Sequence, residues 1–288
     1  MSQAMPISEL FSTVLNYFPS GLEHFKKYVG TALKLLFPYI VACICLTALT
    51  TLTGMITGVG IAAHPSLSDG SSASALENTS LPIILVAIVA GLLLFVLSLL
   101  IIPFAIYYSF CKLRFIVNSH KQTVETLAST NLWAFDDSFW GYLGLACLLF
   151  LIAIPSIIAI AIGFLLVLPG WAMLGLFSAY CNSTIFSYFE DPTSGVSTAL
   201  GKGLEVVKAG WKQWLILSLI LGLFVIAFYI IYIPIAITVV MVDVLPIMAF
   251  LFKVIMYTIY PFLGFYSLCI YYRCYRDLLP SIPNQQLG

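Results

Sequence analysis

The chain has 288 residues, of which 61% are hydrophobic and only 8% are charged. A soluble globular domain carries roughly 25% charged residues, so this composition excludes an ordinary soluble protein and predicts one that resides in a membrane. Twelve basic residues balance twelve acidic residues, and a chain without net charge has no bulk attraction for nucleic acid. We therefore expect membrane lipids, other membrane proteins or a second copy of the chain as partners, and no nucleic acid.

Uncharged apolar runs recur along the chain. A helix needs about 20 apolar residues to cross a hydrocarbon core about 30 Å thick. Helices satisfy their own backbone hydrogen bonds in lipid, so we predict an all-α, polytopic membrane protein with six transmembrane helices. The predicted spans are residues 35–62, 82–110, 141–162, 164–188, 214–239 and 245–271. They make up a transmembrane domain over residues 35–276, which a cytoplasmic segment (1–34) precedes and a short cytoplasmic tail (277–288) follows.

The third and fourth runs are nearly continuous from Gly141 to Tyr188. A single helix of this length would measure about 72 Å, more than twice the hydrocarbon thickness, so we predict two antiparallel helices. Gly163 and the tripeptide Leu168-Pro169-Gly170 supply the turn between them. The first apolar run begins only near Leu35, too late for the core of a signal peptide, and we expect no cleavage.

The basic residues fall on one side of the predicted membrane. Eleven of the twelve lie before span one, between spans two and three, between spans four and five, or after span six. The loops on the opposite side carry Asp69, Glu77 and Asp243 but no Lys or Arg. Cytoplasmic loops are enriched in basic residues, so both termini are predicted to be cytoplasmic.

The segment over residues 192–213 has the pattern of an amphipathic helix. Asp191 followed by Pro192 is a typical helix start. Apolar residues then recur every three or four positions, at Val196, Leu200, Leu204, Val207, Trp211 and Trp214. We predict an interfacial helix that lies among the lipid headgroups and continues into span five, with Trp211 and Trp214 as anchors.

The segment before span one is similar. Ser20 and Glu23 form a capping-box pattern, which predicts a helix start at Ser20. Gly21-Leu22-Glu23 with Lys26 is repeated at equal spacing by Gly203-Leu204-Glu205 with Lys208. This repetition indicates a duplicated unit of one amphipathic helix and one transmembrane hairpin, with coincidence as the alternative.

An aromatic segment over residues 131–140 precedes span three and contains Trp133 and Trp140. We expect both tryptophans to anchor at the membrane interface, and Asp137 to cap the start of span three. A third, shorter interfacial helix is the alternative.

The second half of the chain carries a wider pattern. It consists of Leu168-Pro169-Gly170, Glu190-Asp191, then Ala199-Leu200-Gly201-Lys202-Gly203-Leu204 with Lys208, Trp211 and Trp214, and finally Pro261, Tyr271-Tyr272-Arg273 and Tyr275-Arg276-Asp277-Leu278. Over residues 165–278 this order resembles bacterial six-helix inner-membrane proteins related to the glycerophosphoryl diester phosphodiesterase membrane domain. The resemblance implies the fold and a bacterial inner-membrane location. It brings no catalytic motif and no soluble phosphodiesterase domain.

Lys253 is the only charged residue within a predicted span, and an ionisable group inside a bilayer suggests a functional site. A structural explanation competes with this hypothesis. Lys253 and Arg273 lie 20 residues apart, about 30 Å along a helix, so they could extend to opposite interfaces. We favour this interfacial placement with Asp243 as the partner of Lys253, and keep a pathway-lining Lys253 as the alternative.

Two further features concern helix packing. Gly54 and Gly58 form a G-x-x-x-G spacing in span one, which lets helices approach closely within a chain or between chains. Pro155, Pro234 and Pro261 lie inside spans three, five and six. Prolines kink helices, which is common in transporters but also serves ordinary packing.

No feature points to catalysis. The seven cysteines form no metal-binding spacing and are expected to be buried hydrophobes. His24, His64 and His120 occupy three separate segments, with His64 on the other side of the membrane, so no three-histidine metal site is expected. The carboxylate pairs Asp136-Asp137 and Glu190-Asp191 are expected at helix starts.

The sequence therefore predicts a protein with no catalytic residue, no cofactor and no metal. The favoured function is that of a membrane scaffold, accessory subunit or bilayer-organising protein. A small-solute or lipid transporter or channel, with a pathway between two hairpin repeats, is the alternative.

Overall fold

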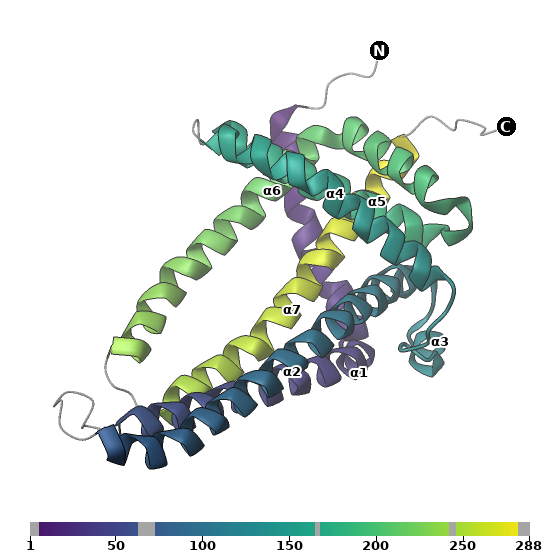
Figure 1. Ribbon diagram of the computed structural model, residues 1–288. Coiled ribbons are helices and arrows are strands. Elements are labelled where there is room, and N and C mark those ends of the chain that lie inside the picture. The colour runs from purple at the N-terminus through teal and green to yellow at the C-terminus, as the bar shows by residue number, and fades with distance from the viewer. Residues whose placement is uncertain (1–5, 63–72, 165–167, 242–245, 282–288) are drawn as a thin grey trace. The chain divides into compact units, whose positions relative to one another are not determined.

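The computed structural model describes residues 6–62, 73–164, 168–241 and 246–281, and every regular element within these ranges is a helix (Figure 1). The α-helices are α1 (Ile7–Ala62), α2 (Ala73–Lys121), α3 (Val124–Ser129), α4 (Ser138–Phe164), α5 (Leu168–Glu190), α6 (Gly195–Met241) and α7 (Pro246–Leu278). Two short 3-10 helices, η2 (Pro192–Ser194) and η3 (Leu279–Ser281), precede α6 and follow α7. The all-helical class predicted from the sequence is confirmed.

Helix α1 is longer than the capping pattern at Ser20 predicts. It begins at Ile7 and runs without a break through Ser20, so the predicted helix start is wrong. The physical reason lies in the preceding residues. Leu10, Val14 and Tyr17 recur every three or four positions and are all buried, which gives the first turns an apolar face of their own.

The long apolar stretch from Gly141 to Tyr188 forms two separate helices, as predicted. Helix α4 ends at Phe164 and α5 begins at Leu168. Their ends pack closely, because a Cβ atom added to Gly163 would lie 3.0 Å from the Cα atom of Gly170. These glycines allow the two backbones to approach where the chain reverses.

Helix α6 covers both the predicted interfacial segment and span five, and it contains one interruption. Gly210 has φ −121° and ψ 25°, outside the helical region. The start also differs in detail from the expected cap. Asp191 and Pro192 begin the 3-10 helix η2 instead, and Gly195, with a φ of 81°, separates η2 from α6. Gly210 therefore divides α6 close to the point where the sequence separates an amphipathic part from an apolar one.

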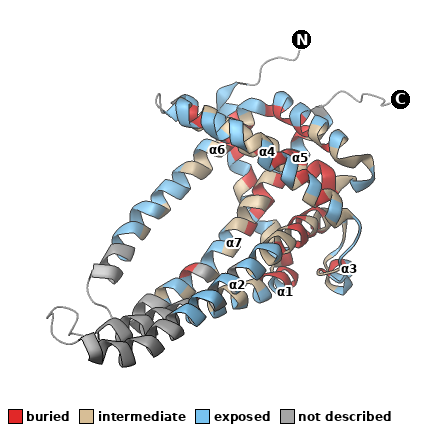
Figure 2. Cartoon of the chain, viewed as in Figure 1, coloured by how far each residue is buried: buried red, intermediate tan, exposed pale blue. Residues whose placement is uncertain are grey.

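Five helices in the described part of the chain are long and apolar enough to cross a membrane, namely α1, α2, α4, α6 and α7. Helix α5 is less apolar, because Asn182, Ser183, Thr184 and Ser187 interrupt its second half. Large apolar side chains also lie exposed on the outer faces of α4 and of the second half of α6 (Figure 2). Apolar surface of this extent is typical of helices that contact lipid. The five long apolar helices and this exposed apolar surface are consistent with a membrane protein.

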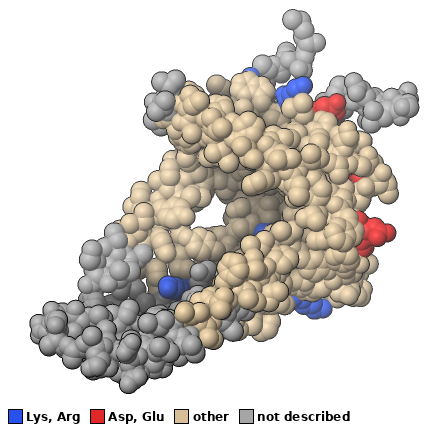
Figure 3. All heavy atoms as spheres, viewed as in Figure 1, with Lys and Arg blue, Asp and Glu red and all other residues tan. Residues whose placement is uncertain are grey.

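The chain divides into two compact units. Unit 1 contains residues 1–35, 109–235 and 262–288, and unit 2 contains residues 36–108 and 236–261. Eleven of the twelve basic residues belong to unit 1, and the twelfth, Lys253, belongs to unit 2. Charges are nevertheless sparse on the surface, and the described part of the face in Figure 3 is mostly uncharged.

Aromatic contacts hold unit 1 together at the ends of the predicted spans. The ring of Phe110 on α2 lies 5.3 Å from Phe139 and 5.6 Å from Tyr142 on α4, measured between centroids. It also lies 5.5 Å from Phe189 on α5. Trp214 on α6 stacks on Tyr271 on α7 at 5.8 Å. The Phe110 contacts join the ends of three predicted spans, at residues 110, 141 and 188, and the Trp214–Tyr271 contact joins the ends of two others, at residues 214 and 271. We call the residues that make them, Phe110, Phe139, Tyr142, Phe189, Trp214 and Tyr271, the aromatic layer.

Unit 2 has an aromatic contact of its own. Tyr39 on α1 stacks on Tyr108 on α2 with centroids 4.2 Å apart and an angle of 12° between the rings. Phe104, one turn before Tyr108 in α2, lies 6.4 Å from the Tyr39 ring. Helices α1 and α2 therefore lie side by side here, as expected for a transmembrane hairpin.

Candidate functional site

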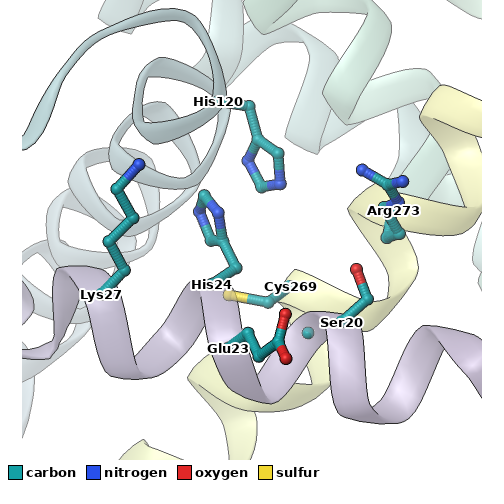
Figure 4. A pocket seen from close by; sticks show the side chains of 8 residues that line it. Ser20, Glu23, His24, Lys27, His120, Cys269 and Arg273 are labelled. Atoms are coloured by element: carbon teal, nitrogen blue, oxygen red, sulfur yellow. The ribbon is translucent and has the colours of Figure 1, made fainter.

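Three helices of unit 1 bring polar side chains together around two histidines. His24 comes from α1, His120 from the last turn of α2, and Cys269 and Arg273 from α7 (Figure 4). Gly21 makes this arrangement possible, because a Cβ atom at this position would lie 2.9 Å from Cγ1 of Ile270 on α7. The missing side chain lets α1 approach α7, which places the next turn of α1, with His24, beside the site.

The two imidazole rings stack on each other. Their centroids lie 3.7 Å apart and their planes differ by 18°. The outer face of the pair is also covered, because the ring of Tyr272 lies 4.5 Å from that of His120. The chain holds these two rings, 96 positions apart, in one fixed stack.

Hydrogen bonds define which nitrogen of each ring carries a proton. Ser119 donates its hydroxyl hydrogen to the carbonyl of Ile116 at 2.7 Å, so the Ser119 oxygen accepts from Nε2 of His24, also at 2.7 Å. His120 donates from Nδ1 to the same Ile116 carbonyl at 3.0 Å. A neutral imidazole has one donor and one acceptor nitrogen. Nδ1 of His24 and Nε2 of His120 are therefore the acceptor nitrogens.

The surroundings favour the neutral form of both rings. His24 and His120 lie outside the predicted spans, at 35–62 and 82–110. Burial lowers the pKa of His24 to about 3, with further contributions from His120, Lys27 and Arg273. Burial likewise lowers the pKa of His120, and this effect is larger than that of the hydrogen bond to the Ile116 backbone, which raises it. At neutral pH the pair is uncharged and offers two acceptor nitrogens.

A cavity of about 250 Å³ opens beside the histidine pair. Its wall carries two cations, Lys27 and Arg273, and one carboxylate, Glu23. In Figure 4, Lys27 extends on one side of the imidazole pair and Arg273 approaches from α7 on the other, while Glu23 lies below the two rings. Ser20, Gly21 and Cys269 complete the lining. We call this space the histidine cavity.

A second cavity, of about 600 Å³, shares part of this lining. His24, Lys27 and His120 line both spaces, and Tyr28, Gln122 and Glu125 belong to the second. The hydroxyl of Tyr28 donates to the carbonyl of Gln122 at 2.9 Å, which ties α1 to the chain just after α2. The imidazole pair thus lines both cavities.

A network centred on Glu190 fixes the α7 side of the site. The Tyr272 hydroxyl donates to Oε1 of Glu190. Lys121 lies 3.4 Å from Oε2 and donates to the Glu190 backbone carbonyl at 3.0 Å. Arg276 approaches Oε1 at 3.9 Å. One carboxylate at the end of α5 thereby links the ends of α2 and α7.

The aromatic segment before α4 is held by Arg114. The Arg114 guanidinium pairs with Asp136 at 2.5 Å and donates to the carbonyl of Ala134 at 2.9 Å. Asp136 also accepts from the backbone N–H of Ser138 at 3.1 Å. The carboxylate that caps α4 is therefore that of Asp136, and the expectation for Asp137 is wrong. The reason is that the Arg114 contact positions Asp136 over the helix start.

The four predicted interfacial tryptophans differ in exposure. Trp211 and Trp140 are 48% and 62% exposed, and Trp133 is half-buried and donates from Nε1 to the Lys34 carbonyl at 3.4 Å. Trp214 is fully buried in the aromatic layer, so the expectation that it anchors at the lipid interface is wrong. The buried stripe of α6 runs through Ala199, Gly203, Val206, Gly210 and Trp214, because Gly203 and Gly210 fit against neighbouring helices.

Of the other predicted site residues, Lys253, Asp243, Gly54 and Gly58, only Lys253 has its side-chain surroundings within the described residues. Lys253 lies on α7 with its side chain exposed, but Asp243 lies outside the described residues, so the predicted ion pair stays a prediction. Gly54 and Gly58 lie in α1, in a part whose side-chain surroundings are outside the description. The described residues contain no group of three or more metal-ligand side chains.

The histidine pair was not predicted from the sequence. His24 and His120 were assigned to the same side of the membrane, but their distance in the chain gave no reason to join them. A signal existed in retrospect, since both lie about ten residues beyond the ends of adjacent antiparallel spans. Antiparallel neighbours that continue past the membrane bring such positions together.

Comparisons with protein-family models, curated proteins and solved structures find no match to this chain. The predicted resemblance to the phosphodiesterase-related membrane proteins therefore stays a prediction, and the site has to be interpreted from its own chemistry.

Proposed function

We propose that the chain is a six-span protein of a bacterial inner membrane, with both termini in the cytoplasm, that acts as a membrane scaffold or bilayer-organising protein. Helix α5, whose second half is buried among its neighbours, completes the count of six. The observation that carries the proposal is the aromatic layer. Its contacts join the ends of three predicted spans and, separately, the ends of two others. It belongs to the same unit as the eleven basic residues that predict the cytoplasmic side.

The surface of α6 supports contact with lipid headgroups. Leu204 and Trp211 are 44% and 48% exposed, and Lys208 and Lys212 are exposed beside them. The Lys212 ammonium lies 5.6 Å from the centre of the Trp211 ring. Exposed apolar and basic side chains on one helix are typical of interfacial helices. In this proposal residues 195–209 lie among the headgroups, and the break at Gly210 turns the chain into span five.

The duplicated unit also remains part of the proposal. Gly21 faces Ile270 on α7, and Gly203 faces the backbone of Thr184 on α5. The two corresponding glycines thus both occupy close helix contacts. This agreement supports two related halves, each with a polar helix segment and a hairpin.

A reconstitution experiment tests the proposed scaffold function. Vesicles that contain the purified protein should retain entrapped ions, small dyes and lipid asymmetry as well as protein-free vesicles do. Spin-labelled anionic lipid should be immobilised by the wild-type protein and less so by the double variant Lys208→Gln/Lys212→Gln. The matched control is Lys26→Gln, which removes one exposed cation elsewhere. Equal immobilisation by the wild type and the double variant would contradict the proposal.

A transporter is the second candidate, and the histidine cavity with its charged wall favours it. Rapid solute flux or lipid exchange in the same vesicles would support this function instead. Lys253→Met then separates the two placements of Lys253. Unchanged flux is expected if Lys253 lies at an interface, whereas a large loss of flux would place it on the pathway.

A further inference from the structure

The chemistry of the histidine cavity matches one class of ligand. Its wall combines two cationic side chains, Lys27 and Arg273, with one carboxylate, Glu23, and two imidazoles that offer acceptor nitrogens. A simple anion would meet the carboxylate and the two lone pairs as unfavourable neighbours. A simple cation would meet Lys27 and Arg273 in the same way. A ligand that carries both charges satisfies all five side chains.

We propose that the histidine cavity binds a phosphate ester that carries a primary ammonium group, which is the chemistry of a phosphoethanolamine headgroup. The phosphate accepts hydrogen bonds from Lys27 and Arg273, and guanidinium and ammonium groups are the usual partners of phosphate oxygens. The ammonium donates to the Glu23 carboxylate and to an acceptor nitrogen of the imidazole pair. This inference rests on the proposed orientation only where it names a lipid as the source of the ligand.

The position of the cavity suits a lipid headgroup. Cys269 and Arg273, which line it, lie on either side of Tyr271, the last residue of predicted span six. Tyr271 also belongs to the aromatic layer through its stack with Trp214. On α7 the cavity therefore reaches the end of predicted span six, close to the depth that phosphate groups occupy in a bilayer. On α1 and α2 its wall lies about ten residues beyond the ends of the predicted spans.

The walls of the cavity differ in rigidity. The histidine pair is fixed by its hydrogen bonds and by Tyr272. Glu23, Lys27 and Arg273 are exposed, and Arg273 lies 3.6 Å from Asp277 on the next turn of α7. Preformed acceptors with adjustable charges at the rim allow a polar ligand to enter without breaking the helix contacts.

The proposal is tested by calorimetric titration of the purified full chain in detergent. The probes are O-phosphoethanolamine, O-phosphocholine, glycerol 3-phosphate and inorganic phosphate. We expect O-phosphoethanolamine to bind about tenfold more tightly than the other three, since only it combines a phosphate with an ammonium that donates hydrogen bonds. Native mass spectrometry with short-chain phosphatidylethanolamine, phosphatidylcholine and phosphatidylglycerol repeats the comparison for lipids.

Two variants with matched controls complete the test. Glu23→Gln should remove the preference for the primary ammonium, while Lys26→Gln, one turn along and outside the lining, should retain it. Arg273→Gln should weaken all phosphate probes about tenfold, whereas Asp277→Asn, which releases Arg273 from its ion pair, should not weaken them. A cooperative unfolding transition for each variant shows that it is folded.

The possible results distinguish a lipid from a free phosphate ester as the source of the ligand, and they distinguish support for the proposal from its rejection. A preference seen with both the free ester and the lipid, or with the lipid alone, supports the proposal, and the second result identifies a lipid as the source. Equal binding of the ethanolamine and choline compounds, an unaltered preference in Glu23→Gln, or no binding of any probe would overturn it. Binding of the free ester in detergent does not depend on the orientation of the protein in the membrane. It therefore tests this inference independently of the proposed topology.

Discussion

Tyr272 on α7 donates its hydroxyl hydrogen to the carboxylate of Glu190 at the end of α5, 82 positions away in the chain. Lys121 at the end of α2 and Arg276 on α7 reach the same carboxylate. One side chain therefore connects three helices where they leave the predicted membrane. The stability of this end of unit 1 should depend on the charge of Glu190.

Glu190→Gln is expected to destabilise the protein. The amide can still accept from Tyr272, but the charge that attracts Lys121 and Arg276 is lost, and these groups remain half-exposed. We expect the free energy of unfolding to fall by about 1–2 kcal/mol, the range for a hydrogen bond to a charged group reduced by solvent screening. Unfolding in mixed detergent micelles, followed by tryptophan fluorescence, measures the change.

Glu205→Gln is the matched control, because Glu205 is exposed on α6. Its effect should stay within about 0.5 kcal/mol, as for other surface substitutions. Equal effects of the two substitutions would show that Glu190 does not connect the helices.

Gly203 and Gly201 should respond in opposite directions to the same substitution. A Cβ atom at Gly203 would meet the backbone of Thr184 on α5, which cannot move aside, whereas Gly201 faces open space. Gly203→Ala should therefore cost about 1–3 kcal/mol through overpacking. Gly201→Ala should be neutral or stabilising by up to about 1 kcal/mol, since alanine is the better helix former. The same unfolding assay compares them, and a harmless Gly203→Ala would disprove the close contact between α5 and α6.

Acidification should destabilise the protein through the histidine pair. Burial lowers the pKa of both rings below the ordinary value of 6.5, so the unfolded chain binds protons that the folded chain resists. The neutral histidine pair therefore makes its full contribution to the free energy of unfolding above about pH 6.5. This contribution is lost as the pH falls toward the folded pKa of about 3 for His24. Lys27, Arg273 and Arg276 oppose protonation, while Glu190 favours it at His120.

We expect the free energy of unfolding to fall between about pH 7.5 and about pH 5, by at most about 2 kcal/mol for each histidine. The double variant His24→Gln/His120→Gln should show a flatter dependence over this interval. Denaturant titrations at several pH values measure both proteins. A wild-type protein that gains stability on acidification, or a variant with the same slope, would contradict the assignment of neutral histidines.

The sequence was sufficient for the helical class and for features that depend on local patterns. The separation of α4 from α5 follows from helix length against membrane thickness, and Gly163 and Pro169 mark the turn. The amphipathic part of α6 was expected to end at residue 213, close to the interruption at Gly210, but the interruption itself was not predicted. These features depend on neighbours in the chain, so hydrophobic periodicity and turn residues predict them.

Features that depend on distant residues were predicted poorly. Trp214 belongs to an apolar stripe in the sequence, but only the contact with Tyr271 shows that it is buried. The capping residue of α4 changes from Asp137 to Asp136 because Arg114, 22 positions earlier, binds Asp136. The stacked histidines likewise require the pairing of α1 with α2 and the missing side chain of Gly21. Local propensity does not contain these tertiary contacts.

The central claim is that the eleven basic residues and the aromatic layer lie on the cytoplasmic side of six spans. Single cysteines introduced at Ser197 and at Ser72 test it most directly, with the unmodified chain as the background control. Intact cells are treated with a membrane-impermeant maleimide, and then permeabilised cells are treated in the same way. The account predicts labelling of Ser72→Cys in intact cells and of Ser197→Cys only after permeabilisation. Labelling of Ser197→Cys in intact cells would contradict it.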